Sequence, residues 1–494
     1  MTAVAPPSIL HLTAATGGGV DRYIRDLAAS VPRRHYIWHV GSGLDVIEDL
    51  ATKSFFPLRE ASNGSRGAEV LRHWLKAAGI GGAHVHGVDQ YCRKRLALLG
   101  QALPIPWIAT LHDLMFINPD AFHGPGVPEA DASWIGEIAA TLRQAQAIVV
   151  PSQFIQGLVL RHLPGLDARI VAPGLDGSGD AAPRSPPQEF LAQRPQHIVA
   201  IVGAIGPHKG STLLDALVAH LEGTGIGLVV IGYTDTELTP GWRVPGRYYV
   251  CGPYLDQNLQ SVLAGFAVDV ALFPNRMPES FSYTLSEVWA AGIPAVVPDE
   301  GALGERVGRS GGGWRLPPSY TAADAARFLR RIFAADGIEE RARVKSEIDP
   351  SDSARVPSLD AMSREIDALY QHFGLPTDAE RADPAAARDA LEPLLATSLD
   401  GFAFRKELIK LAAEVVELKT AVAQARPWAA KVERDIAEAQ AWARKLEHDV
   451  ETLTAELGTS LAENRVLADD KAAFDQLPLI VRKFLIRKAF RARR

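Results

Sequence analysis

The stretch PESFSYTLSEVWAAGIP, residues 278–294, holds the features from which the fold is inferred. Two glutamates, Glu279 and Glu287, stand either side of a polar segment that opens a helix ending at Gly292. The apolar run PAVVPD that follows predicts a strand. A helix start offers unpaired backbone N–H groups and a partial positive charge, which suit an anion such as phosphate. Carboxylates on either side of that anion can hold hydroxyl-rich groups.

Outward from this stretch, strand and helix patterns alternate over residues 197–345. The strands HIVAIVG, GLVVIG, RYYVCG and VDVALFP precede it, and the loop AIGPHKGS, which contains Lys209, leads from the first of them into a helix. Such alternation favours a parallel sheet covered by helices on both faces. Because ligands bind beyond the carboxyl ends of the strands in such sheets, we expect Lys209 and residues 278–294 to share one site.

Residues 1–180 repeat the pattern, with strands at SILHL, YIWHV, AHVH, PWIATLH and AIVVPS. Glycines 17–19 follow the first strand, where they let a ligand approach the backbone, although a tight turn into a helix would need glycine too. The dinucleotide fingerprint G-x-G-x-x-G is absent, so nicotinamide binding is not indicated. His112 and Asp113 end one strand, and His84 and His86 end another; such residues either face a ligand or cap a loop.

Residues 177–196 are rich in Pro, Gly, Ser and Ala, which predicts an exposed linker. The length of 494 residues agrees with several domains. We expect an α/β protein with two Rossmann-like, doubly wound domains that face a cleft. The expected order is a first domain at 1–180, a linker at 181–196, a second domain at 197–345, a return helix and linker at 346–400, a coiled coil at 401–468 and a basic amphipathic tail at 469–494.

The coiled coil is expected because residues 408–457 place apolar side chains in alternating steps of three and four. Pro427 lies within this pattern and predicts a local kink. A long helix that folds back on the globular part of its own chain is the alternative. We favour self-association, which makes the protein a homo-oligomer.

The segment at 477–494 contains seven Arg or Lys residues and no acid, interleaved with bulky apolar side chains. This favours contact with an anionic membrane surface, with nucleic-acid binding and a solvated tail as alternatives. The net charge of −6 gives the whole chain no nucleic-acid character. A cytoplasmic protein is predicted, because the chain has only two cysteines, no visible signal peptide and no apolar run long enough to span a membrane. The basic tail would place it at the inner face of the cell membrane.

Several of these segments together resemble the retaining glycosyltransferases of the GT-B fold, specifically the family-four group. They are the GGG loop, TLHD at 110–113, VVPSQF with VAPGLD, VGAIGPHKG and ESFSYTLSE, and the resemblance covers about residues 8–373. It implies transfer of a sugar from a nucleotide-diphosphate sugar to a glycan or lipid-linked acceptor, with retention of configuration. It also implies that no metal or other cofactor takes part, and it suggests a role in cell-surface polysaccharide assembly.

The resemblance assigns roles to individual residues. Lys209 would bind the donor pyrophosphate, and Glu287 would bind the ribose hydroxyls. The catalytic pair would be Glu279, which holds hydroxyls of the transferred sugar, and His112, which contacts that sugar near the reacting centre. The other donor-binding positions would be the glycines that let the lobes close and the amides at the helix start, namely Gly18, Gly19, Ser282, Tyr283 and Thr284.

Two positions depart from the family pattern. Ala204 stands where an Arg is common, so one phosphate-facing cation is missing unless His208 or Arg276 replaces it. Ser282 stands where Gly is common, which is a mild change because serine begins helices well. Two other functions stay open: a nucleotide-sugar epimerase with the same two-lobed fold, and a non-catalytic scaffold subunit that recruits partners through the coiled coil.

Overall fold

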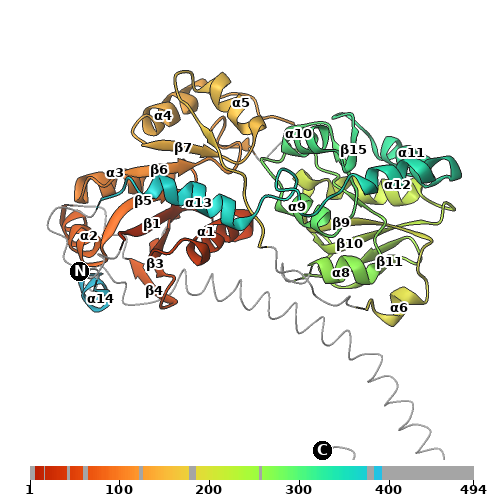
Figure 1. Ribbon diagram of the computed structural model, residues 1–494, viewed down its shortest axis with the longest axis horizontal. Coiled ribbons are helices and arrows are strands. Elements are labelled where there is room, and N and C mark those ends of the chain that lie inside the picture. Colours follow the sequence, from red (N-terminus) through yellow and green to blue (C-terminus); the bar gives the residue numbers. More distant parts are fainter. Residues whose placement is uncertain are drawn as a thin grey trace, which may run out of the picture. The chain divides into compact units, whose positions relative to one another are not determined.

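The computed structural model describes residues 6–15, 17–41, 45–58, 65–121, 126–176, 185–254, 259–374 and 383–391 (Figure 1). The predicted coiled coil at 401–468 and tail at 469–494 lie outside these residues. The described residues form two α/β lobes. We call residues 6–176 together with helices α13 and α14 the first lobe, and residues 185–358 the second lobe.

The first lobe is built on an eight-stranded sheet in the order β4-β3-β2-β1-β5-β6-β7-β8. β3 runs antiparallel to both of its neighbours, and the other pairs are parallel. The strands are β1 Ser8–Thr13, β2 His35–His39, β3 Asp45–Asp49, β4 Ser54–Leu58, β5 Ile80–Val85, β6 Trp107–Thr110, β7 Ala147–Val150 and β8 Arg169–Ile170.

Helices cover both faces of this sheet (Figure 1). Side chains alternate along β1, so Ile9 packs under α1 and α13 while Leu10 and Leu12 pack under α2 and α3. Helix α14 packs beside α2. The helices of this lobe are α1 Gly18–Ser30, α2 Ser65–Ala77, α3 Gln90–Ala102, α4 Ala132–Leu142, α5 Gln153–His162, α13 Leu359–Tyr370 and α14 Pro384–Leu391.

The second lobe is built on a seven-stranded sheet in the order β11-β12-β10-β9-β13-β14-β15. β11 is antiparallel to β12, and the other pairs are parallel. The strands are β9 His197–Ile205, β10 Ile226–Thr234, β11 Gly241–Val244, β12 Tyr248–Val250, β13 Val270–Leu272, β14 Ala295–Pro298 and β15 Gly313–Leu316.

Both faces of the second sheet are covered as well. Val199 and Ile201 of β9 pack with α7 and α11, whereas Ile198 and Ala200 pack with α6, α8, α9 and α10. The helices are α6 Gln188–Leu191, α7 Leu214–His220, α8 Leu259–Phe266, α9 Tyr283–Ala290, α10 Gly301–Ser310, α11 Ala322–Phe333 and α12 Ile338–Ser346, and short 3₁₀ turns lie at Pro207–Lys209, Ser211–Leu213 and Ala335–Gly337.

This architecture confirms the predicted pair of α/β domains with mainly parallel sheets. Helix α6 was not predicted and falls inside the expected linker at 181–196. It forms because Phe190 is fully buried against Trp242, at 5.3 Å between ring centroids, and against Phe266, at 4.7 Å. The strands β3 and β4 were also not predicted.

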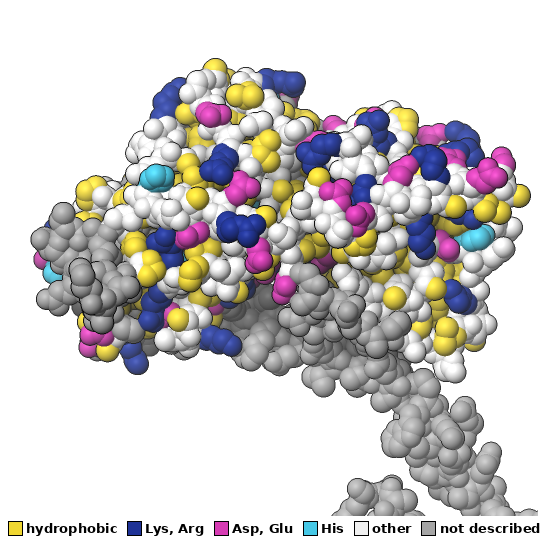
Figure 2. Space-filling view, in the orientation of Figure 1, with side chains coloured by type: hydrophobic (Ala, Val, Ile, Leu, Met, Phe, Trp, Pro, Cys, Tyr) yellow, Lys and Arg dark blue, Asp and Glu magenta, His cyan; other side chains and the backbone are white. Residues whose placement is uncertain are grey.

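The surface in view carries charges of both signs, interspersed over both lobes (Figure 2). On that face the basic side chains do not merge into one continuous area. Among the helices that the structure describes, none has both the length and the apolar composition needed to cross a bilayer.

Candidate functional site

A pocket of about 950 Å³ is lined by residues of both lobes. Its walls are loops that follow the carboxyl ends of β1, β6 and β7 in the first lobe and of β9 and β13 in the second. This is the edge at which parallel α/β sheets bind ligands. All nine predicted site residues line the pocket: Gly18, Gly19, His112, Lys209, Glu279, Ser282, Tyr283, Thr284 and Glu287.

The glycines after β1 begin helix α1 at the edge of the pocket. Gly18 has φ +70°, a left-handed conformation that favours glycine. A Cβ at Gly19 would lie 3.7 Å from the ring of Tyr283 in the second lobe. The start of α1 therefore lies beside the start of α9, at a distance where a Cβ at Gly19 would make an ordinary van der Waals contact.

Lys209 ends a 3₁₀ turn that closes at Gly210. Gly210 has φ +85°, and a Cβ there would lie 2.0 Å from the carbonyl oxygen of Pro274. The loops after β9 and β13 therefore pack backbone against backbone, and His208 O accepts hydrogen bonds from the amides of Arg276 and Met277 at 2.9 and 3.1 Å. This contact fixes Lys209 beside the loop that carries Glu279.

Glu279 is held by two groups of the second lobe. Its Oε1 accepts a hydrogen bond from Asn275 Nδ2 at 2.8 Å and lies 3.5 Å from Lys209 Nζ. The ammonium and the carboxylate are both partly exposed to the pocket. A cation and a carboxylate are thus arranged side by side, suited to a ligand that joins an anion to hydroxyl groups.

Helix α9 begins at the pocket with Ser282 as its N-cap. Ser282 Oγ accepts a hydrogen bond from the amide of Leu285 at 3.3 Å. One turn further, Glu287 accepts a hydrogen bond from Arg22 Nη1 of the first lobe at 2.7 Å. The guanidinium of Arg22 also lies 4.6 Å from the ring centroid of Tyr283. Arg22 therefore links α1 to α9 across the pocket.

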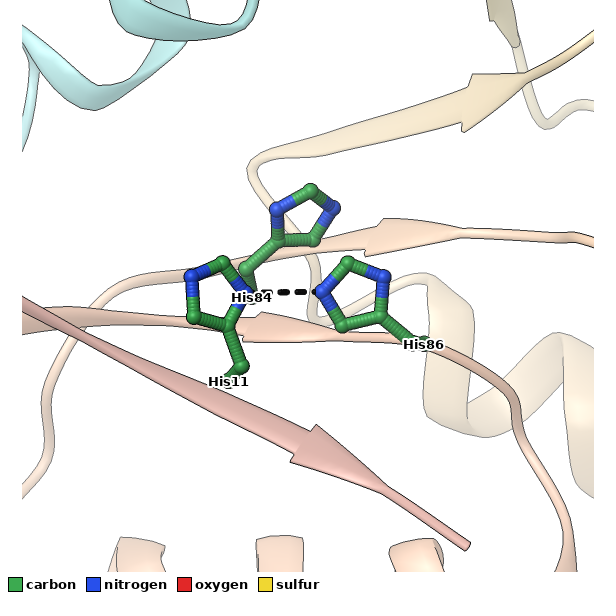
Figure 3. Close-up of side chains that lie close together, drawn as sticks. All are labelled: His11, His84 and His86. Carbon is green, nitrogen blue, oxygen red and sulfur yellow. Dashed lines mark hydrogen bonds between the residues drawn. The ribbon is translucent and has the colours of Figure 1, made fainter. Parts of the chain in front are cut away.

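His112 is joined to a row of buried histidines that crosses the first sheet. His112 Nε2 lies 3.0 Å from His86 Nδ1. His86 Nε2 lies 2.9 Å from His11 Nδ1, a contact drawn in Figure 3. His11 Nε2 lies 2.8 Å from His35 Nδ1, and His35 Nε2 lies 3.4 Å from the carbonyl oxygen of Val31. We call these four residues, His112, His86, His11 and His35, the histidine chain.

The histidine chain consists of neutral rings. Burial lowers the pKa of His112 to about 3 and that of His35 to about 4, and it lowers the pKa of His11 and His86 well below the ordinary range. The second cause for His11 and His86 is the charge of neighbouring histidines. Because a charged ring would be desolvated here, each ring keeps one N–H donor and one acceptor nitrogen.

One end of the histidine chain sets its direction, because the carbonyl of Val31 can only accept. His35 Nε2–H donates to it, so His35 Nδ1 must accept from His11, which in turn accepts from His86. His86 Nδ1 then accepts from His112 Nε2–H. The remaining nitrogen of His112, Nδ1, is left as an acceptor.

His84 is a neighbour of the histidine chain but not a member. Its Nδ1 lies 2.6 Å from Tyr370 Oη and its Nε2 lies 2.7 Å from Thr110 Oγ1. The side chains of His11, His84 and His86 are close enough to hold a metal ion (Figure 3). In the structure, both ring nitrogens of each of these residues have a hydrogen-bond partner instead.

The two proposed replacements for the Arg missing at Ala204 differ. Arg276 donates to the carbonyl of Tyr320 at 2.9 Å and stacks on that ring, and it does not line the pocket. His208 does line the pocket, but burial and the nearby Lys209 lower its pKa, which favours the neutral ring. Arg22 is the residue that sequence reasoning missed, because its position on an amphipathic helix gives no sign of a partner in another lobe.

Asp113, noted only as the end of a strand, also lines the pocket. Burial raises the pKa of its carboxyl to about 6, and the charge of Asp89 adds to this, although the amide of Met115 donates to Asp113 at 2.9 Å and opposes it.

Comparison with known proteins relates the chain to glycosyltransferases. Residues 17–178 match the model of Glycosyltransferase Family 4. The sequence matches no curated protein. Among solved structures, HepE of Anabaena in complex with UDP and glucose is 16% identical, with a TM-score of 0.53 and coverage of 74% of this chain and 99% of that chain.

Two further structures are similar to the same extent. Sucrose-phosphate synthase of Thermosynechococcus elongatus is 18% identical, with a TM-score of 0.52, and the match covers 74% of this chain and 98% of that chain. A glycosyltransferase from Rickettsia africae is 15% identical, with a TM-score of 0.52 and the same coverage. The fold of the described lobes is therefore the GT-B fold of these enzymes.

Proposed function

We propose that the protein is a retaining glycosyltransferase that moves a sugar from a nucleotide-diphosphate sugar to a glycan or glycolipid acceptor. One observation carries the proposal: a single pocket brings together the ammonium of Lys209, the start of α9, two carboxylates and His112. This set matches the parts of such a donor, which are a diphosphate, a ribose and a sugar. The match of residues 17–178 to Glycosyltransferase Family 4 supports the same reaction.

In this proposal the diphosphate lies between Lys209 and the amides of Ser282, Tyr283 and Thr284. Glu287 binds the ribose hydroxyls, and Glu279 binds hydroxyls of the transferred sugar. When the glycosidic bond breaks, negative charge develops on the leaving diphosphate, and donors already aimed at it lower the barrier. Glu279 orients the sugar rather than transferring a proton, because the leaving diphosphate needs little protonation.

His112 would face the sugar with an acceptor nitrogen. The direction of the histidine chain leaves Nδ1 of His112 as the acceptor, so this atom suits a hydroxyl donor of the transferred sugar. A neutral acceptor at this place binds a sugar without adding charge near the diphosphate.

Arg22 is our candidate for the second cation beside the diphosphate, in place of the Arg missing at Ala204. It lines the pocket, and its link to Glu287 keeps it at the start of α9. An arginine there can move between the carboxylate and a phosphate oxygen, because both accept from a guanidinium.

Turnover distinguishes the proposal from its two rivals. A transferase releases nucleoside diphosphate only when donor and acceptor are both present, and Glu279→Ala abolishes that release. An epimerase converts donor sugars without an acceptor. A scaffold subunit shows no turnover with any donor and acceptor pair, and it loses assembly when residues 402–494 are deleted.

The donor can be found before the acceptor is known. UDP-glucose is the first donor to test, because HepE was solved with UDP and glucose. A donor present at 100 times its Kd stabilises the folded state by about 2.7 kcal/mol, which a thermal-shift screen of nucleotide sugars detects.

Two parts of the proposal depend on residues outside the described ranges. We propose that residues 408–457 form a coiled-coil oligomer and that residues 477–494 bind an anionic membrane surface. These two features would place the enzyme at the inner face of the cell membrane, where it would serve cell-surface polysaccharide assembly. A monomer in light scattering at micromolar concentration contradicts the first. Unchanged liposome binding after deletion of 471–494 contradicts the second.

A further inference from the structure

A buried arginine lies directly behind the segment that starts helix α9. Arg306, in α10, is 2% exposed. Its Nη1 donates to the carbonyl oxygens of Phe281 and Ser282 at 3.1 and 2.9 Å. Its Nη2 donates to Ser286 Oγ at 2.6 Å and to the carbonyl of Arg355 at 2.8 Å.

The guanidinium of Arg306 is enclosed by aromatic rings and neutral acceptors. It lies 4.1 Å from the ring centroid of Phe281 and 5.2 Å from that of Trp289. Burial lowers its pKa to about 9, so it stays cationic at neutral pH. Within the described part of the chain, its four hydrogen bonds all go to carbonyl or hydroxyl oxygens. Burying a cation without a carboxylate partner is costly, so the four hydrogen bonds of Arg306 are needed to offset that cost.

The two carbonyls that Arg306 holds fix the direction of two amides. A peptide unit is planar and trans, so its C=O and its N–H point to opposite sides. The carbonyl of Phe281 shares a plane with the N–H of Ser282, and the carbonyl of Ser282 shares one with the N–H of Tyr283. Because both oxygens point inward to Nη1 of Arg306, both N–H groups point away from it.

Phe281, Ser282 and Tyr283 all line the pocket. Among the amides at the start of α9, that of Leu285 donates to Ser282 Oγ. The amides of Ser282 and Tyr283 have no hydrogen-bond acceptor among the described residues, as expected for the first N–H groups of a helix.

The same contact explains how serine is tolerated at position 282. Ser282 has φ +73°, one of three non-glycine residues with positive φ in the described chain. This conformation costs a non-glycine residue about 1 kcal/mol or more and persists only where the surroundings impose it. Arg306 is bonded to the carbonyls on both sides of the Ser282 Cα, so it restrains this unfavourable backbone conformation.

We propose that Arg306 is a positioning residue that holds Ser282 in its left-handed conformation and aims the amides of Ser282 and Tyr283 at the donor diphosphate. The proposal rests on the proposed function for the identity of the ligand. Glycine at position 282 would adopt the same conformation unaided. Serine at this position therefore needs the buried arginine, whereas glycine would not.

The test is a double-mutant comparison in the full-length protein. The variants are Arg306→Met, Ser282→Gly, the double variant, and Arg309→Met as control. Arg309 lies three residues further along α10, is about half exposed, and pairs with Glu305 at 3.9 Å rather than with residues 281–286. UDP, GDP and ADP are titrated by calorimetry, and the tightest is used as the probe.

Loss of two aligned N–H donors to a charged ligand predicts that Arg306→Met binds the probe about tenfold to a hundredfold more weakly. In the Ser282→Gly background, the same Arg306→Met change weakens binding by less than about threefold, because glycine adopts the positive φ unaided and so rescues the loss. Arg309→Met binds like the unaltered protein. A merely structural role for Arg306 would give no such rescue by glycine, and absence of rescue overturns the proposal.

Hydrogen exchange separates this proposal from the proposed function. Arg306→Met is expected to increase amide exchange at residues 281–286 without nucleotide, while exchange in the first lobe stays unchanged. Unaltered exchange at 281–286 overturns the positioning role, whatever the affinity. If the unaltered protein binds none of the three nucleotides, the proposed function fails, and the exchange result alone decides whether Arg306 holds the segment.

Discussion

The two halves of the pocket are built in different ways. In the second lobe, Lys209 and Glu279 come from two neighbouring loops and are fixed by contacts within that lobe. Glu287 follows in helix α9 and pairs with Arg22 of the first lobe. In the first lobe, His112 is fixed by a row of buried side chains from three other parts of the sequence. A site formed by a contiguous stretch can be predicted from the amino-acid sequence. A network of residues from distant segments can be identified only from the folded structure.

The largest effect is expected in the second lobe. Lys209→Met removes the cation placed for the diphosphate, and we expect kcat/KM to fall about a hundredfold to a thousandfold. The matched control is Arg276→Met in the same pair of loops, where the guanidinium stacks on Tyr320 outside the pocket. Steady-state kinetics with the donor found in the screen gives the comparison. Equal losses in both variants would contradict the assignment of Lys209.

A smaller but more specific effect is expected from the histidine chain. His86→Leu interrupts the chain next to His112, so the acceptor at His112 Nδ1 is no longer enforced. We expect kcat to fall about tenfold while the Kd of the nucleoside diphosphate stays unchanged, because the proposed function places His112 at the sugar and not at the diphosphate. His84→Leu is the matched control, since it is equally buried on the neighbouring part of the same segment and bonds to Tyr370 and Thr110 instead.

Both histidine variants lose stability, so their kinetics are compared per folded molecule. A fall in kcat of equal size in both would mean that packing, rather than the direction of the histidine chain, determines the effect.

The metal content of the purified protein tests the same network. We expect less than about 0.1 zinc per chain and unchanged activity after EDTA treatment, because the ring nitrogens of His11, His84 and His86 are engaged in hydrogen bonds. If mass spectrometry finds one zinc per chain, and this zinc is lost in His11→Leu, then these histidines bind a metal ion and do not form the hydrogen-bonded histidine chain.

The smallest effect concerns Asp113. Its pKa is about 6 in the folded protein against 3.8 ordinarily, so the folded state holds this proton more tightly than the unfolded state. This contribution to stability is full below about pH 4 and is lost as pH rises towards 6. The Tm of the unaltered protein minus the Tm of Asp113→Asn should therefore decrease from pH 4 to pH 7. A constant difference would contradict the raised pKa.

The fold was predictable where strands are continuous apolar runs, as in β9 and β10. β3 was not, because three of the five residues of DVIED are acidic. It is nevertheless buried, since Glu48 pairs with Arg25 at 3.1 Å, Asp49 with Arg34 at 2.5 Å, and Asp45 with Arg95. Such partners from distant segments are invisible to periodicity. The same holds for α14, which lies in a stretch predicted to be a linker and packs on α2 through Ala387 and Leu391.

The grouping of the candidate residues around one pocket was predictable to the same degree. Each residue that the resemblance named lies in the pocket, while the groups that support them do not follow from their spacing in sequence. Arg22 lies 265 positions from Glu287, and Arg306 acts on a backbone that the sequence suggests is merely a helix start. The sequence predicts only a mild change at Ser282, because it gives no sign of the positive φ that this residue adopts.

The proposed function requires that the pocket bind a nucleotide-diphosphate sugar through Lys209 and the start of α9. Calorimetric titration of UDP-, GDP- and ADP-sugars into the protein and into Lys209→Met tests it most directly. We predict that one nucleotide class binds the unaltered protein with micromolar Kd and binds Lys209→Met at least about tenfold more weakly. No binding by any of them, or binding that is the same in Lys209→Met, would contradict the claim.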